Sequence, residues 1–175
     1  PLSLACFADS LYTAKRYPEA AKMYMQLGDL LNNQPQQDLA LFRLAMSQLH
    51  IRATDKKARI DLEQLSDAFP RDAGGLRAQI KATDLAFASK KMAPRQALEV
   101  YSRYAQEGQS LLLREECLFK QALINHLSAE NATSVQLCMQ LLREYQEGNL
   151  RTVATALLIQ QLPGVIGQLV KYEEF

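Results

Sequence analysis

The stretch KRYPEAAKMYMQL, from Lys15 to Leu27, has the apolar spacing of an amphipathic helix together with two unusual features. Pro18 stands near its start, and the small residue Ala20 precedes the larger Tyr24 by one helical turn. A proline in the first turn of a helix costs no hydrogen bond, because that N–H has no acceptor within the helix. A small side chain on an apolar face is typical of a place where a second helix crosses closely. The stretch therefore predicts a helix that begins near Pro18 and packs against another helix at Ala20.

The same pattern recurs along the chain as a small residue followed by larger residues at i+4 and i+7. Copies begin at Ala20, Ala58 and Ala97 and, more weakly, at Ser134, which gives spacings of 38, 39 and 37 residues. A second helix with an apolar pattern of its own precedes each copy. Neither helix of such a pair can bury its apolar stripe alone, so neighbouring pairs must stack. Four helical hairpins of nearly constant length indicate an α-solenoid.

The expected fold class is all-α, an α–α superhelix of about four hairpins followed by C-terminal helices. Because β-branched residues are few and never alternate with polar ones, no strands are predicted. The predicted hairpins span about 2–35, 38–70, 76–108 and 111–148, and the C-terminal helices span 150–175 with a break at Pro163. The C-terminal segment is either a cap for the last hairpin or the first helix of a fifth one. Since Pro1 is not a natural start, the sequence is expected to be part of a larger protein.

The composition restricts the classes of function. Apolar residues make up 48% of the chain and charged residues 22%, which is ordinary for a globular domain. A net charge of +1 with interspersed signs gives no basic stripe for nucleic acid. The most apolar region, Thr152 to Val170, is interrupted by glutamines, a proline and glycines, so no membrane insertion is expected within this segment. The three cysteines (Cys6, Cys117 and Cys138) lie far apart without a CxxC or His/Cys cluster, so neither a metal site nor a cofactor is predicted.

The first two hairpins resemble the tetratricopeptide repeat (TPR) family. Ala8 stands at the small position of the family's first helix, Tyr17-Pro18-Glu19-Ala20 resembles its turn and second-helix start, and Tyr24 takes its aromatic place. LEQLSDAFP ends the second hairpin with Pro70, where the family often closes a repeat. The resemblance covers about residues 2–148, with a period longer than the usual ~34. Long units with endings such as AFPRD resemble bacterial envelope TPR proteins, which implies the periplasm and envelope or the cytoplasm as the compartment.

The resemblance also implies a binding surface, because the first helices of TPR hairpins line a concave groove. The implied groove residues are Asp9, Tyr12, Arg43, Ser47, His50, Gln79, Ser89, Phe119 and His126. Such a mixed polar and aromatic surface suits a peptide or a partner helix. TPR adaptors that bind a C-terminal carboxylate carry asparagine where this chain has Asp9 and Ser47. Binding of a C-terminal carboxylate in that way is therefore not expected. Arg43 is either a bidentate partner for a ligand's acid or a solvated or internally paired side chain.

The predicted function is a non-enzymatic scaffold that binds a protein or peptide in the groove, with a bacterial envelope complex as a setting. His50 and His126 occupy equivalent places at helix ends, but no acid or nucleophile recurs at a fixed offset from them, so no catalytic residues are predicted. The alternative is a spacer or self-assembly domain within a larger protein. Its groove would then be empty or filled by its own C-terminal helix. A homodimer through the C-terminal helix is a further expectation.

Overall fold

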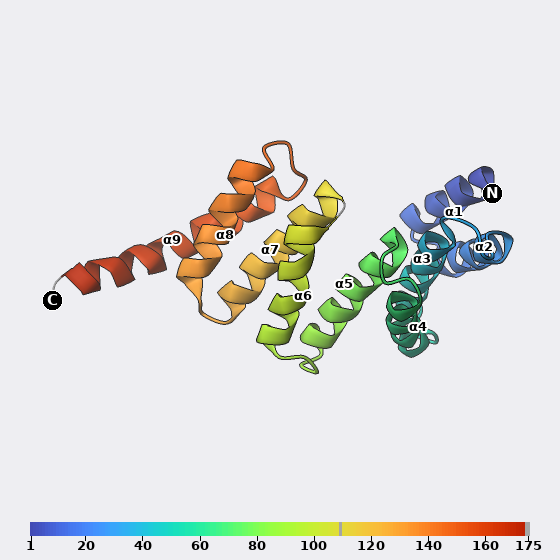
Figure 1. Ribbon diagram of the computed structural model, residues 1–175, viewed down its shortest axis with the longest axis horizontal. Helices are drawn as coiled ribbons and strands as arrows, with labels where there is room; N and C mark the ends of the chain where they lie inside the picture. The colour runs from blue at the N-terminus through green and yellow to red at the C-terminus, as the bar shows by residue number, and fades with distance from the viewer. Residues whose placement is uncertain (109, 174–175) are drawn as a thin grey trace. The chain divides into compact units, whose positions relative to one another are not determined.

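The computed structural model describes residues 1–108 and 110–173, with the side chains of 107 and 167–173 left out of the description. Within this part the chain is all-α, with nine helices and no strand (Figure 1). The helices are α1 (Leu2–Thr13), α2 (Tyr17–Leu30), α3 (Gln37–Leu49), α4 (Asp55–Ala68), α5 (Ala73–Ala88), α6 (Pro94–Glu107), α7 (Leu111–Leu127), α8 (Asn131–Glu144) and α9 (Arg151–Glu173). The all-α prediction is confirmed.

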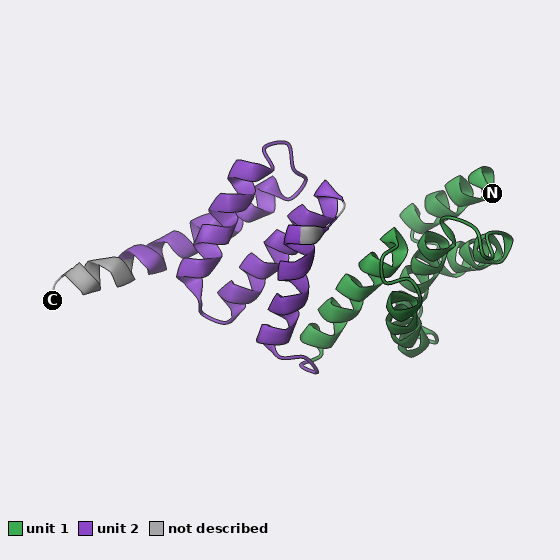
Figure 2. Cartoon of the chain, viewed as in Figure 1, with its two compact units in different colours: residues 1–89 green, residues 90–175 purple. Residues whose placement is uncertain are grey.

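The helices group into two compact units, Pro1–Ser89 with α1 to α5 and Lys90–Phe175 with α6 to α9 (Figure 2). Within each unit, helices that follow one another in the sequence pack together. In addition α3 contacts α5, and α7 contacts α9, each across an intervening helix. Within each unit, this packing of helices on their sequence neighbours is that of an α-solenoid. The predicted repeat boundaries stay predictions.

The helix that contains the opening stretch forms as its sequence predicts. Helix α2 begins at Tyr17 and places Pro18 in its first turn. Ala8 of α1 and Ala20 of α2 are both fully buried and belong to one core cluster with Tyr24. The two small side chains let α1 and α2 approach closely, and Tyr24 fills the space beside them.

The other copies of the pattern are buried in the same way. The residues at the three positions of each copy all lie in the interior: Ala58, Leu62 and Leu65; Ala97, Tyr101 and Tyr104; Ser134, Cys138 and Leu141. In unit 2 the hydroxyl of Ser134 donates to the carbonyl oxygen of Ala122 at 2.7 Å, so this copy joins α8 to α7 through a hydrogen bond as well as by packing. The repeated triplet is therefore the inner face of the helix that carries it.

Two buried carboxylates each accept a hydrogen bond from a backbone amide at the start of a helix that comes much later in the sequence. In unit 1, Asp38 Oδ2 accepts a hydrogen bond from the amide of Gly74, in the first turn of α5, at 2.6 Å. In unit 2, Glu115 Oε1 accepts from the amide of Leu150, just before α9, at 2.8 Å. A carboxylate at this place satisfies an amide that has no acceptor within its own helix and interacts favourably with the helix dipole.

The C-terminal segment differs from the prediction. A break at Pro163 is expected from the sequence, but α9 runs as one helix from Arg151 to Glu173 with Pro163 inside it. An internal proline lacks the N–H that would bond the carbonyl of Ile159, and its ring crowds that carbonyl. Both Pro163 and Ile159 are exposed, so water can satisfy the freed oxygen and the helix continues.

Candidate binding groove

Unit 1 contains a hollow of about 540 Å³, a volume that is ordinary for a ligand pocket. Its walls come from α1, α2 and α3, and α5 closes one side. The apolar lining consists of Leu2, Ala5, Leu27, Leu31, Leu39 and Ala40. The charged side chains that line it are Asp9 of α1, Arg43 of α3 and Arg77 of α5. The hollow therefore combines an apolar interior with charged groups from three different helices.

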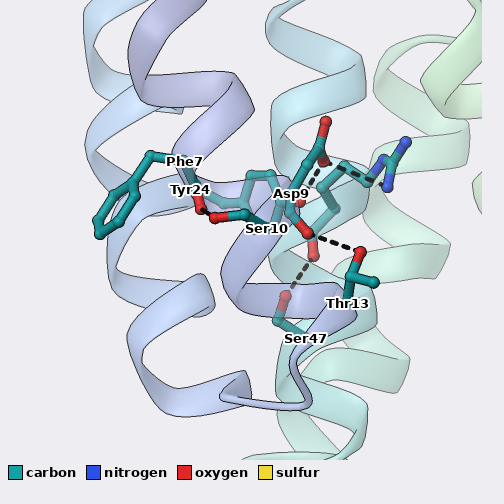
Figure 3. A network of polar contacts seen from close by, with 7 residues as sticks. Phe7, Asp9, Ser10, Thr13, Tyr24 and Ser47 are labelled. Carbon is teal, nitrogen blue, oxygen red and sulfur yellow. Dashed lines mark hydrogen bonds and ion pairs between the residues drawn. The ribbon is translucent and has the colours of Figure 1, made fainter.

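A polar network connects Asp9 to its neighbours (Figure 3). The hydroxyl of Tyr24 donates to Asp9 Oδ1 at 2.5 Å, and the Arg43 guanidinium lies 3.4 Å from the same oxygen. Burial, and then the hydrogen bond to Asp9, hold the pKa of Tyr24 well above its ordinary value, so the phenol remains a donor at neutral pH. The Asp9 and Arg43 side chains are about half exposed, at 52% and 42%, so their ion pair contributes at most about 1 kcal/mol and a ligand can displace it.

Arg77 was not predicted as a groove residue. It is exposed on the groove side of α5 and takes part in no hydrogen bond or ion pair among the described residues. Its repeat equivalent Leu39 lies 38 residues earlier and also lines the hollow, but neither residue was assigned to the groove from the sequence. The Arg77 guanidinium therefore lies beside the apolar lining without an ion-pair partner among the described residues, whereas the Arg43 guanidinium forms an ion pair with Asp9.

Tyr12 and His50 meet in an aromatic cluster where the turn after α1 approaches the end of α3. Tyr12 Oη lies 3.5 Å from His50 Nε2, and the Tyr17 ring stacks on His50 with ring centroids 4.1 Å apart. Tyr12 also makes an edge contact with Tyr17 at 5.4 Å between centroids. Burial and the neighbouring Tyr17 raise the pKa of Tyr12. Two residues predicted from different hairpins thus lie together.

The remaining predicted residues of unit 1 lie outside the hollow. Ser47 is fully buried, and its hydroxyl donates to the carbonyl oxygen of Arg43 at 2.9 Å, so it presents no free group to a ligand. Gln79 is partly buried on α5. The Ser89 hydroxyl is exposed but is bonded to carbonyl oxygens of the last turn of α5. None of these three lines the hollow.

The last two predicted residues belong to unit 2. Phe119 is partly buried and packs against both core clusters formed by α7, α8 and α9. His126 is also partly buried, and its Nδ1 lies 3.1 Å from Asn131 Oδ1 at the start of α8. Both side chains therefore join helices within unit 2, and neither belongs to the hollow in unit 1.

Two further observations concern other kinds of site. In the part of the chain that the structure describes, no three His, Cys, Asp or Glu side chains gather as a metal ion would require. None of the described helices is both long enough and apolar enough to cross a membrane.

Solved structures with a similar helical fold show to which class of fold the chain belongs. Two crystal structures of a Podosopora anserina protein described as a kinesin light chain with nearly identical TPR-like repeats, one of them a point variant, each align with a TM-score of 0.67. Each alignment covers 98% of this chain and 89% of that chain at 14% sequence identity. No protein-family model matches the chain, and no curated protein matches its sequence. At this identity the likeness shows the fold: the chain is a TPR-like helical repeat, as the sequence resemblance predicts.

Proposed function

We propose that this chain is a non-enzymatic protein-interaction scaffold whose unit 1 hollow binds a peptide or a partner helix. The observation that carries the proposal is the combination, in one hollow, of an apolar lining with charged side chains from α1, α3 and α5. Apolar walls supply most of the binding free energy of such a site, and a few polar groups fix the ligand's orientation. TPR-like repeat proteins generally act as scaffolds, which agrees with this role.

The charges of the hollow favour one ligand chemistry. Arg43 and Arg77 face it together with Asp9, so the balance is positive. A carboxylate on the ligand can pair with Arg77 without displacing an internal contact, while Arg43 is already held by Asp9. We therefore infer a ligand that places an apolar side chain in the hollow and an acidic group beside α5, bound by the guanidinium fork.

A peptide library displayed on phage, selected against the chain, tests this function. The affinity of a selected peptide is then measured for the parent, Arg77→Ala and a matched control, Arg95→Ala. The Arg95 side chain is 92% exposed on α6 and lies outside the hollow. Arg77→Ala is expected to weaken binding about tenfold, or about 1.4 kcal/mol, and Arg95→Ala to leave it unchanged. Equal affinities for the two variants would exclude Arg77 as a binding residue.

A second role, that of a spacer or self-assembly domain in a larger protein, is favoured by exposed apolar residues on α9. A homodimer through the C-terminal helix belongs to this second role. Because α9 lies in unit 2 and the hollow in unit 1, the two roles use different surfaces. A bacterial envelope setting is a proposal that rests on the long repeat units and mainly on their AFPRD ending.

A further inference from the structure

A second, smaller hollow lies in unit 1 between α3 and α4, with a volume of about 250 Å³. This volume is below the ~300–1,000 Å³ of pockets that hold drug-sized ligands, so the hollow suits a single side chain. Among the described residues that line it, Asp61 is the one charged residue, and Gln64 follows it on the same helix. The remaining lining residues are apolar: Leu41, Leu44, Ala45, Leu65, Ala68 and Phe69. We call this site the α3–α4 hollow.

The α3–α4 hollow and the larger hollow of about 540 Å³ use different faces of α3. The residues of α3 that line them are Leu39, Ala40 and Arg43 for the larger hollow, and Leu41, Leu44 and Ala45 for the smaller one. Successive residues of an α-helix are about 100° apart around its axis, so these two sets lie on nearly opposite sides of α3. No described residue lines both hollows. Each hollow can therefore be occupied without blocking the other.

Asp61 departs from the repeat pattern of the second helices. It stands three residues after Ala58, the small residue of the repeated triplet. The corresponding residues of the other three copies are apolar and partly buried: Met23, Val100 and Leu137. Of these, Met23 and Leu137 pack against hydrophobic core clusters. Asp61 therefore places a carboxylate where packing alone favours an apolar side chain.

The Asp61 carboxylate also lacks a partner. Asp61 is partly buried, and it takes part in no hydrogen bond or ion pair among the described residues. Two other shielded aspartates of unit 1 are paired, because Asp38 accepts from a helix N-terminal amide and Asp55 pairs with Arg59 at 3.2 Å. Lys57, one turn before Asp61 on α4, is exposed and does not pair with it. A carboxylate that is partly removed from water costs free energy unless it is paired, so a cation on a ligand would gain from meeting it.

We propose that the α3–α4 hollow binds an arginine side chain of a partner protein. The aliphatic part of an arginine can lie on the apolar walls while its charged end stays at the rim. The guanidinium fork matches the Asp61 carboxylate, and the side-chain carbonyl oxygen of Gln64 can accept a further N–H. The larger hollow has the opposite preference, because Arg43 and Arg77 outnumber Asp9 there. This second site goes beyond the proposed function and is independent of peptide binding in the larger hollow.

Titration of the full chain with short peptides, followed by methyl NMR, tests this site. The probes are alanine pentapeptides, acetylated and amidated, with arginine, its uncharged isostere citrulline, or glutamate at the central position. The arginine peptide is expected to shift the methyl signals of Leu41, Leu44 and Leu65, which line the hollow. It should bind about fivefold more tightly than the citrulline peptide, the gain expected of a partly exposed ion pair. The glutamate peptide should leave these signals unchanged.

Substitution of Asp61 shows whether its charge recognises the arginine. Asp61→Asn should lower the affinity for the arginine peptide to that for the citrulline peptide. Asp67→Asn is the matched control, since Asp67 is exposed on the same helix and lies outside the hollow. Arg77→Ala should bind the arginine peptide like the parent, and Asp61→Asn should bind phage-selected peptides like the parent, so failures of the two hollows can be told apart. Unshifted leucine signals at about 20 mM arginine peptide, well above a millimolar Kd, would overturn the proposal, as would equal effects of Asp61→Asn and Asp67→Asn.

Discussion

Replacing Glu115 by leucine should destabilise unit 2 by removing the acceptor that holds the start of α9. Glu115 is 2% exposed, and its Oε1 receives the Leu150 amide at 2.8 Å. Leucine has a similar volume and no acceptor, so the amide would be left without its partner. Glutamine at the same position keeps an acceptor oxygen and should recover most of the stability.

The size of the effect follows from the burial of the donor. A buried donor left unpaired costs about 1–3 kcal/mol. Leu150 is only half-buried, so water can reach part of the site, and the removal of a buried carboxylate also relieves some desolvation. The expected loss is therefore in the lower part of that range, about 1–2 kcal/mol. For a chain of this size each kcal/mol lowers the melting temperature by about 2–4 °C.

Thermal unfolding followed by circular dichroism measures the loss, and hydrogen exchange of the Leu150 amide locates it. Glu99→Leu serves as the control, because the Glu99 side chain is 68% exposed and forms a surface ion pair with Arg95 at 3.6 Å. That control should stay within about 0.5 kcal/mol of the parent. If Glu115→Leu and Glu99→Leu melt together, or the Leu150 amide exchanges no faster, the carboxylate does not hold α9 in place.

Three other substitutions test the packing and the polar network. Ala20→Leu should overpack the contact of α1 with α2 and lower stability by ~1–3 kcal/mol in a denaturant titration. Gly75→Ala should also destabilise the fold, because a Cβ there would clash with the carbonyl oxygen of Phe69. Burial and the Asp9 bond raise the pKa of Tyr24, so the folded chain keeps a proton that the unfolded chain loses above about pH 10. The parent should therefore lose more stability than Tyr24→Phe as the pH rises past that value.

Each of these predictions has a contrary outcome. Ala132→Leu, at an exposed position of α8, should be tolerated, and equal losses for it and Ala20→Leu would contradict the assigned crossing. A Cβ at Gly164 would meet no atom within 4 Å, so Gly164→Ala should be neutral or stabilising. A Gly75 variant as stable as the Gly164 variant would contradict the close approach. Parallel pH profiles for the parent and Tyr24→Phe would show that Tyr24 keeps an ordinary pKa in the folded chain.

Part of the lining of the unit 1 hollow could be predicted from the sequence. Asp9 and Arg43, assigned by the TPR resemblance, do meet and line the hollow. Ser47 was assigned in the same way but is buried, because its hydroxyl bonds the carbonyl oxygen one turn earlier in α3. Arg77 was missed because only the packing of α5 beside α3 brings it to the hollow. Helical spacing places a residue on a face, but the neighbouring helices decide whether that face is exposed.

The sequence by itself determined the helical hairpins and their inner faces. The small residue at Ala20 and its larger followers recur at Ala58 and Ala97, and all of these positions are buried. Such a pattern can be read locally, because an α-helix repeats every ~3.6 residues. Only the tertiary structure decided that Glu115 holds the start of α9 and that this helix continues through Pro163. The carboxylate and its amide are 35 residues apart, and the accommodation of the proline depends on an exposed turn, so both follow from how the helices stack.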